Sequence, residues 1–271
     1  AQDQDTLTRF RAKASATAGF ALMTPEGYNG TWNAGACCAP ANTSLVNHVA
    51  VITAMLDDAE QVLAIDPDRV FATGHSNGGM MAYRLACQLS DRIAAIAPNA
   101  AVMMNRYLDG NQPLQLYACQ PTRPVAVLHL HGLADACTPY NGGVSAGIAG
   151  GRRESAAESV GHWVAENRCA TPSQSSYDNG TAHCETYGSC QNGADVELCT
   201  IAGGGHVWPG NLSNPSAGTC GGSATTYTAG GITHFEGNAP KLYVAGESGL
   251  PRARAASAAA CPSVTLRGLR G

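Results

Sequence analysis

The segment Val70-Phe-Ala-Thr-Gly-His-Ser-Asn-Gly-Gly-Met-Met-Ala-Tyr-Arg-Leu-Ala-Cys87 joins a short apolar run to an amphipathic one. Its β-branched and aromatic start predicts a buried strand, and its apolar residues at helical spacing predict a helix. Between them lies Gly-x-Ser-x-Gly, the nucleophile-elbow pattern, with Ser76 at the apex. Its glycines lack a Cβ, which is expected to let strand and helix close around a strained turn. The segment predicts Ser76 as a nucleophile and the N–H of Asn77, at the helix start, as an oxyanion donor.

The composition is that of a globular protein without a strong charge bias. Of the 271 residues, 44% are hydrophobic and 13% are charged, and the net charge is −4. A single α/β domain can reach this length. The lack of a basic surplus argues against nucleic acid as the main partner, and no apolar run approaches the roughly 18–20 residues of a membrane span. We therefore expect neither a nucleic-acid nor a membrane partner, and the oligomeric state stays open.

The cysteines indicate the compartment in which the protein works. Eleven are too many for a typical cytosolic enzyme, and they lie among glycine-, serine- and asparagine-rich loops, which predicts a secreted protein with disulfides. A zinc site is the alternative, but no C-x₂-C pair occurs. The pairing stays open, and an odd count leaves at least one thiol free or paired between chains. The cysteines are Cys37, Cys38, Cys87, Cys119, Cys137, Cys169, Cys184, Cys190, Cys199, Cys220 and Cys261.

Predicted strands and helices alternate along much of the sequence. This alternation implies a mostly parallel, doubly wound α/β sheet with active groups on the loops that follow its carboxyl ends. The cysteine-bearing stretch 169–193 is interpreted as an insertion, and the basic Ala/Arg-rich tail 246–271 as peripheral to a catalytic domain of residues 1–245. The expected strands are 20–23, 70–73, 93–97, 125–130 and 196–201, and the expected helices are 6–18, 45–63, 79–89 and 153–167.

Two later loops supply partners for Ser76. A serine hydroxyl needs a base, usually a histidine that a carboxylate orients. Asp135 follows the strand 125–130, and His206 follows the strand 196–201 in a Gly-Gly-Gly-His-Val-Trp-Pro-Gly loop. The order serine, acid, histidine is the one that this kind of elbow takes. The pattern predicts a triad, against the alternatives of a turn-capping aspartate and an ordinary loop histidine.

Other candidate residues carry weaker signals. Trp32 and Trp208 lie in glycine-rich loops and could stack on an aromatic or polymeric substrate, although core packing explains them nearly as well. His129 and His131 alternate along one strand face like a metal pair, but no third ligand has a suitable place. We interpret them as hydrogen-bonded strand-end histidines and expect no metal and no organic cofactor.

The elbow occurs together with several other motifs, at residues 32–38, 74–87, 89–98, 129–135 with Pro139-Tyr140, and 203–210. Together these motifs resemble the polyhydroxybutyrate depolymerase esterase family, which includes feruloyl and acetylxylan esterases. The resemblance implies a secreted protein with the α/β-hydrolase fold and with Ser76, Asp135 and His206 as its triad. Compared with that family, the usual N-terminal strands and a loop that donates one oxyanion N–H are expected to be missing.

The function expected from the sequence is serine carboxylesterase chemistry on feruloyl or acetyl esters of plant polysaccharide. The first alternative is depolymerisation of polyhydroxyalkanoates or related polyesters. The alternative of another class is a catalytically impaired, truncated hydrolase fold that binds its ligand but turns it over poorly.

Overall fold

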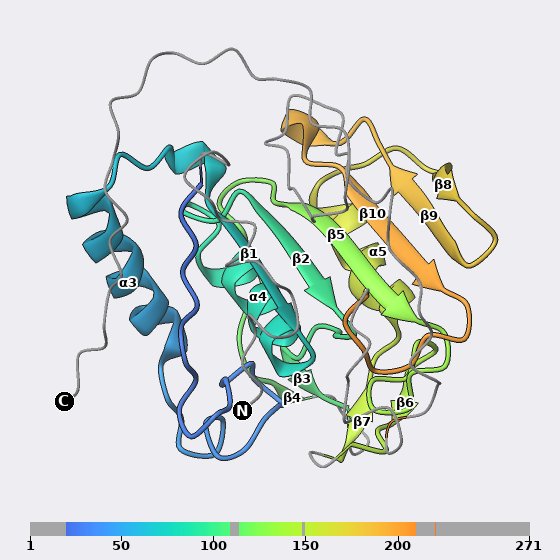
Figure 1. Cartoon of the computed structure of the whole chain (residues 1–271), viewed down its shortest axis with the longest axis horizontal. Coiled ribbons are helices and arrows are strands. Elements are labelled where there is room, and N and C mark those ends of the chain that lie inside the picture. Colours follow the sequence, from blue (N-terminus) through green and yellow to red (C-terminus); the bar gives the residue numbers. More distant parts are fainter. Residues whose placement is uncertain (1–19, 109–113, 148–149, 210–219, 221–271) are drawn as a thin grey trace.

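The computed structural model describes residues 20–108, 114–147, 150–209 and 220. The predicted helix at 6–18, the tail from 246 and the domain boundary at 245 lie outside these residues. The larger described elements form one six-stranded sheet with the order β1-β2-β5-β10-β9-β8, with helices packed against it (Figure 1). Its strands are β1 (Phe71–His75), β2 (Ala95–Asn99), β5 (Ala126–Gly132), β8 (Gln174–Asp178), β9 (Ala182–Tyr187) and β10 (Val196–Ile201).

The first four strands of the sheet are parallel. β1 pairs with β2, β2 with β5 and β5 with β10, all in the parallel sense. The register places His75 opposite Asn99, and Ile201 opposite Gly132. Because carboxyl ends of parallel strands meet at one edge, the loops after these four strands converge there. The mostly parallel sheet confirms the expected architecture.

Three described helices share a core with one face of the sheet. They are α3 (His48–Val62), α4 (Asn77–Gln88) and α5 (Ala156–Glu166). The side chain of Asn47 caps α3, and Ser155 with Glu158 forms a complete capping box at α5, which fixes where both helices begin. The shared core, which is 7% exposed or less, includes Ile52, Leu56, Met81, Tyr83, Leu85, Ile96, Val127, Val160, Trp163 and Leu198.

The remaining described elements are short. They are η1 (Pro67–Arg69), η2 (Gln191–Gly193), and two small hairpins that pair β3 (Arg106–Tyr107) with β4 (Leu114–Gln115) and β6 (Gly143–Val144) with β7 (Arg152–Arg153). With the strand–elbow–helix unit β1–α4 and the parallel sheet order, this is the α/β-hydrolase fold. Among the described helices, none combines the length and the hydropathy that a membrane span requires.

Two sequence expectations are wrong in detail. The apolar run 20–23 forms no strand, since none of the described strands pairs with it, and Phe20 is 48% exposed. The supposed insertion at 169–193 instead contains β8 and β9, which extend the sheet in the antiparallel sense beyond β10. The sequence Gln-Ser-Ser-Tyr-Asp of β8 is mostly exposed and lacks the apolar alternation that marks a strand. Backbone pairing with β9 holds it at the edge.

The ten described cysteines form five disulfides. The pairs are Cys37–Cys38, Cys87–Cys119, Cys137–Cys220, Cys169–Cys190 and Cys184–Cys199. Two of them lie on the β8–β9 side of the molecule: Cys184–Cys199 joins β9 directly to β10, and Cys169–Cys190 joins the segment after α5 to the residue that precedes η2. The eleventh, Cys261, lies outside the described residues.

Candidate active site

Ser76 lies at the sharp turn between β1 and α4. Its backbone has φ 54° and ψ −121°, a left-handed conformation that an ordinary residue rarely adopts. A Cβ on Gly74 would collide with the backbone of Gly78, and a Cβ on Gly79 would come within 2.7 Å of Ala101. A Cβ on Gly78 would meet nothing within 4 Å. The glycines of the motif are Gly74 and Gly78, and the sequence suggested that the tight turn needs both. The close contacts instead require glycine at 74 and at 79, and not at 78.

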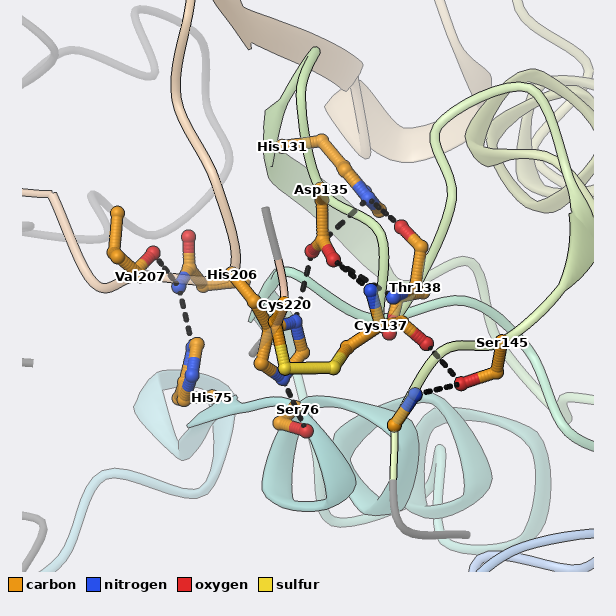
Figure 2. A network of polar contacts seen from close by, with 12 residues as sticks. His75, Ser76, His131, Asp135, Cys137, Thr138, Ser145, His206, Val207 and Cys220 are labelled. Carbon is orange, nitrogen blue, oxygen red and sulfur yellow. Dashed lines mark hydrogen bonds and ion pairs between the residues drawn. A yellow bond between two sulfur atoms is a disulfide. The ribbon is translucent and has the colours of Figure 1, made fainter. Parts of the chain in front are cut away.

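The loops after β5 and β10 bring Asp135 and His206 to Ser76. Nε2 of His206 lies 2.7 Å from Oγ of Ser76, and Nδ1 of the same ring lies 2.8 Å from Oδ2 of Asp135 (Figure 2). The aspartate is 4% exposed and the histidine 6%. A carboxylate accepts, so Nδ1 of His206 carries the proton and Nε2 accepts from the serine hydroxyl. Three residues predicted from separate loops thus form one hydrogen-bonded row.

The acid loop is fixed by its own backbone. Oδ1 of Asp135 accepts hydrogen bonds from the N–H groups of Cys137 (2.9 Å) and Thr138 (2.7 Å). This leaves Oδ2 for the histidine. Gly132 touches the backbone of Gly204 and Gly205 so closely that a Cβ there would collide with both. The acid loop and the histidine loop can therefore lie directly against each other.

Asn99 joins the nucleophile to the histidine loop, and no sequence pattern pointed to it. Its carbonyl accepts the N–H of Ser76 at 2.9 Å, while its side-chain Nδ2 lies 3.0 Å from the carbonyl of Val207 and 2.8 Å from Nδ1 of His75. The His75 ring packs 4.7 Å from the His206 ring, centroid to centroid. The only available signal was its place at the carboxyl end of β2, where the register sets it opposite His75.

The side chain of Asn77 binds the backbone of Trp32. The side-chain amide of Asn77 accepts the N–H of Trp32 at 2.6 Å and donates to its carbonyl at 3.0 Å. The N–H of Asn77 itself lies in the first turn of α4, where helical N–H groups have no acceptor within the helix. The Trp32 ring is half-buried and contacts His48 edge-on at 4.8 Å. The paired amides hold the Trp32 loop next to the elbow.

Trp208 lies inside the protein. Its side chain is 5% exposed, so it offers little surface on which a substrate could stack.

One group of potential metal ligands lies close together in the described ranges, namely Cys184, Glu197 and Cys199. Its two sulfurs are joined to each other in a disulfide, which removes them as thiolate ligands.

Three buried histidines surround this site, and burial sets their charge. Desolvation lowers the pKa of His131 and lowers the pKa values of His75 and His129 well below the usual 6.5. Neighbouring histidines add to the effect: His206 and His131 lower the pKa of His75, and His131 lowers that of His129. These rings therefore stay neutral at a pH at which an exposed histidine would begin to take up a proton.

This burial predicts a protein that loses stability as the pH falls. Below pH 6.5 the unfolded chain takes up protons at these histidines and the folded chain does not, so acid favours unfolding. Each histidine that stays neutral should lower the free energy of unfolding by about 2 kcal/mol between pH 7 and pH 5. Glu154 and Glu197, whose pKa values burial raises, act in the opposite direction towards pH 5.

Guanidinium unfolding at pH 7, 6 and 5 measures this effect. We expect the guanidinium concentration at the midpoint of unfolding to fall as the pH falls. The slope of the unfolding free energy against guanidinium concentration should stay constant. An unfolding free energy that stays level or rises from pH 7 to pH 5 would contradict neutral histidines in the folded state.

Comparison with known proteins adds an independent observation. Feruloyl esterase B of Piromyces equi is 34% identical over 203 residues, which is 72% of this chain and 35% of that protein. The putative esterase NocK of Nocardia uniformis subsp. tsuyamanensis is 32% identical over 228 residues, which is 78% of this chain and 62% of that protein. The chain thus spans less than two thirds of the length of either relative. Both relatives carry the name esterase.

Two further likenesses are more distant. The prolyl oligopeptidase family matches residues 46–146, a stretch that includes the elbow and Asp135 but not His206. The solved acetyl xylan esterase from Aspergillus awamori superposes with a TM-score of 0.46 at 15% identity, over 67% of this chain and 69% of that one. At that distance the superposition bears on neither the fold nor the function.

Proposed function

We propose that this protein is a carboxylic-ester hydrolase in which Ser76, His206 and Asp135 act as a catalytic triad. The observation that carries the proposal is the position of His206, whose two ring nitrogens lie 2.7 Å from the serine Oγ and 2.8 Å from the aspartate Oδ2. The esterase names of two relatives above 30% identity support the same chemistry.

The proposed reaction begins with attack by Oγ of Ser76 on the ester carbonyl carbon. Nε2 of His206 takes the hydroxyl proton and returns it to the leaving alcohol, while Asp135 stabilises the imidazolium that forms. Asn77 N–H donates to the tetrahedral oxyanion. Water, deprotonated by His206, then hydrolyses the acyl-enzyme and restores the serine. No cofactor takes part in these steps.

The substrate class is proposed from the relatives and from the surroundings of the site. Feruloyl and acetyl esters of plant polysaccharide come first, since one relative is named a feruloyl esterase. Trp32 is the candidate for contact with an aromatic acyl group, because its backbone is fixed to Asn77 and its ring is only half-buried. Trp208 is a weaker candidate, since its side chain is buried. Five disulfides in the described residues support a secreted enzyme.

A substrate panel tests this function on the full chain. We expect hydrolysis of p-nitrophenyl acetate and methyl ferulate, and release of acetate from acetylated xylan. Clearing of a polyhydroxybutyrate film without ferulate release would favour the polyester alternative. Cleavage of only a prolyl p-nitroanilide would replace the esterase by a peptidase, and an inert folded protein would favour the impaired hydrolase fold.

A further inference from the structure

Tyr83, His129 and His131 form a buried row of hydrogen bonds between α4 and the acid loop; we refer to it as the Tyr83–His129–His131 relay. The Tyr83 hydroxyl lies 2.6 Å from Nδ1 of His129, and Nε2 of His129 lies 2.8 Å from Nδ1 of His131. Nε2 of His131 lies 2.7 Å from the carbonyl oxygen of Thr138. All three side chains have an exposed fraction of 0%.

The last acceptor fixes every proton in this row. A carbonyl oxygen can only accept, so Nε2 of His131 carries a proton and Nδ1 of that neutral ring must accept. His129 then donates through Nε2 and accepts through Nδ1, and the Tyr83 hydroxyl is the donor to it. Burial lowers the pKa values of both histidines and raises that of Tyr83, which agrees with a row of uncharged groups.

The row ends on the turn that holds the triad carboxylate. The carbonyl of Thr138 accepts from His131, and the N–H of the same residue donates to Oδ1 of Asp135 at 2.7 Å. Nε2 of His131 also lies 3.7 Å from Oδ2 of Asp135. At the other end, Tyr83 belongs to α4, the helix whose N-cap is Ser76. The row therefore connects the helix of the nucleophile to the loop of the acid.

We infer that His131 is a positioning residue for the Asp135 carboxylate, and that Tyr83 and His129 hold the His131 ring in the tautomer that can donate to Thr138. This inference rests on the proposed function. With the backbone of Thr138 held at its carbonyl oxygen, the turn keeps the N–H groups of Cys137 and Thr138 on Oδ1, and Oδ2 stays aimed at His206. If the His131 ring lost its Nε2 proton, its lone pair would face both the Thr138 carbonyl and the carboxylate.

Tyr83→Phe tests the start of the relay. The variant removes one oxygen atom and leaves His129 without its donor. We expect kcat for p-nitrophenyl acetate to fall about threefold to tenfold, the factor that one neutral hydrogen bond is worth, with KM changed by less than about twofold. In ¹⁵N NMR spectra, the Nδ1 and Nε2 shifts of His129 and His131 should change relative to the wild type.

Tyr117→Phe is the matched control. Tyr117 is also a buried tyrosine, at 6% exposed, but the groups that act on it include the backbone of Met104 and the Arg84 guanidinium, and neither belongs to the relay. Its variant should keep both kcat and the histidine shifts. Equal kcat in Tyr83→Phe and the wild type, with unchanged histidine shifts, would overturn the inference.

A pair of variants at His131 tests the donor itself. The amide of His131→Gln can place an N–H close to the position of Nε2, whereas His131→Leu removes the donor at similar size. We expect the glutamine variant to retain at least about a third of kcat and the leucine variant to lose about tenfold or more. Equal losses in the two variants would count against positioning through Thr138.

The readouts separate this inference from the proposed function. Circular dichroism identifies a variant that fails to fold, and in that case Tyr83→Phe decides. If the wild type hydrolysed no ester, the proposed function would fail while the ¹⁵N shifts still reported the tautomers. If Ser76→Ala lost activity but Tyr83→Phe matched the wild type in rate and shifts, the triad would stand and the relay would fall.

Discussion

Replacing Ser76 with alanine should reduce kcat for p-nitrophenyl acetate by on the order of 10⁵–10⁶. In the proposed triad, only the Ser76 hydroxyl forms the acyl-enzyme, and His206 and Asp135 do not replace it. The cost comes from chemistry and not from folding. Among the contacts described, the only side-chain contact that the substitution removes is the one between the Ser76 hydroxyl and His206, and the strained backbone at φ 54° costs alanine as much as serine. KM should change little, because the substrate contacts remain.

Ser90→Ala is the control for this substitution. Ser90 is a buried serine, 2% exposed, whose hydroxyl contacts Thr122. It should keep full activity. An alkyl fluorophosphonate should label the wild type at residue 76 by peptide mass spectrometry, and the Ser76→Ala variant should take up no label. Esterase activity that persists in Ser76→Ala, or a label on another residue, would remove Ser76 as the nucleophile.

Asp135→Asn should lower kcat by about 10⁴ while the fold stays intact. The reason is the direction of hydrogen bonding. The amide oxygen of asparagine would take the two backbone N–H groups of Cys137 and Thr138, which places its NH₂ group against Nδ1 of His206. The histidine would then accept at Nδ1 and carry its proton on Nε2. In that tautomer it cannot take the proton of Ser76.

The control for the aspartate is Asp195→Asn. Asp195 is a partly buried aspartate outside the site, and burial raises the pKa of its carboxyl. Its variant should hydrolyse p-nitrophenyl acetate at the wild-type rate. Steady-state kinetics on the full chain measure the rate, and the ¹⁵N shifts of His206 report its tautomer. An Asp135→Asn enzyme with more than about a tenth of the wild-type kcat would contradict an orienting carboxylate.

The central part of the fold could be predicted because its signals are local. The strand, the elbow and the helix around Ser76 lie within eighteen consecutive residues, and each carries its own periodicity or turn chemistry. Asp135 and His206 could be found because each directly follows a recognisable apolar strand. Parallel pairing then brings the ends of those strands together.

The elements that the sequence did not predict depend on distant partners. β8 is a strand because β9 pairs with it, although its own residues are polar. The run at 20–23 is apolar but finds no neighbouring strand within the described residues. Asn99 and Tyr83 gain their roles from residues far along the chain, since Asn99 contacts Val207 and Tyr83 contacts His129. Side-chain periodicity within one segment carries no information about such contacts.

The open space beside Gly78 bears on how such proteins are found in sequence collections. The contacts at Gly74 and Gly79 leave no room for a methyl group, whereas a methyl group at position 78 would meet no other atom within 4 Å. Alanine is also the better helix former at a position inside a helix. A pattern search that demands glycine at the fifth letter is therefore stricter than the elbow itself. Proteins that read Gly-x-Ser-x-Ala-Gly would pass unnoticed while folding the same turn.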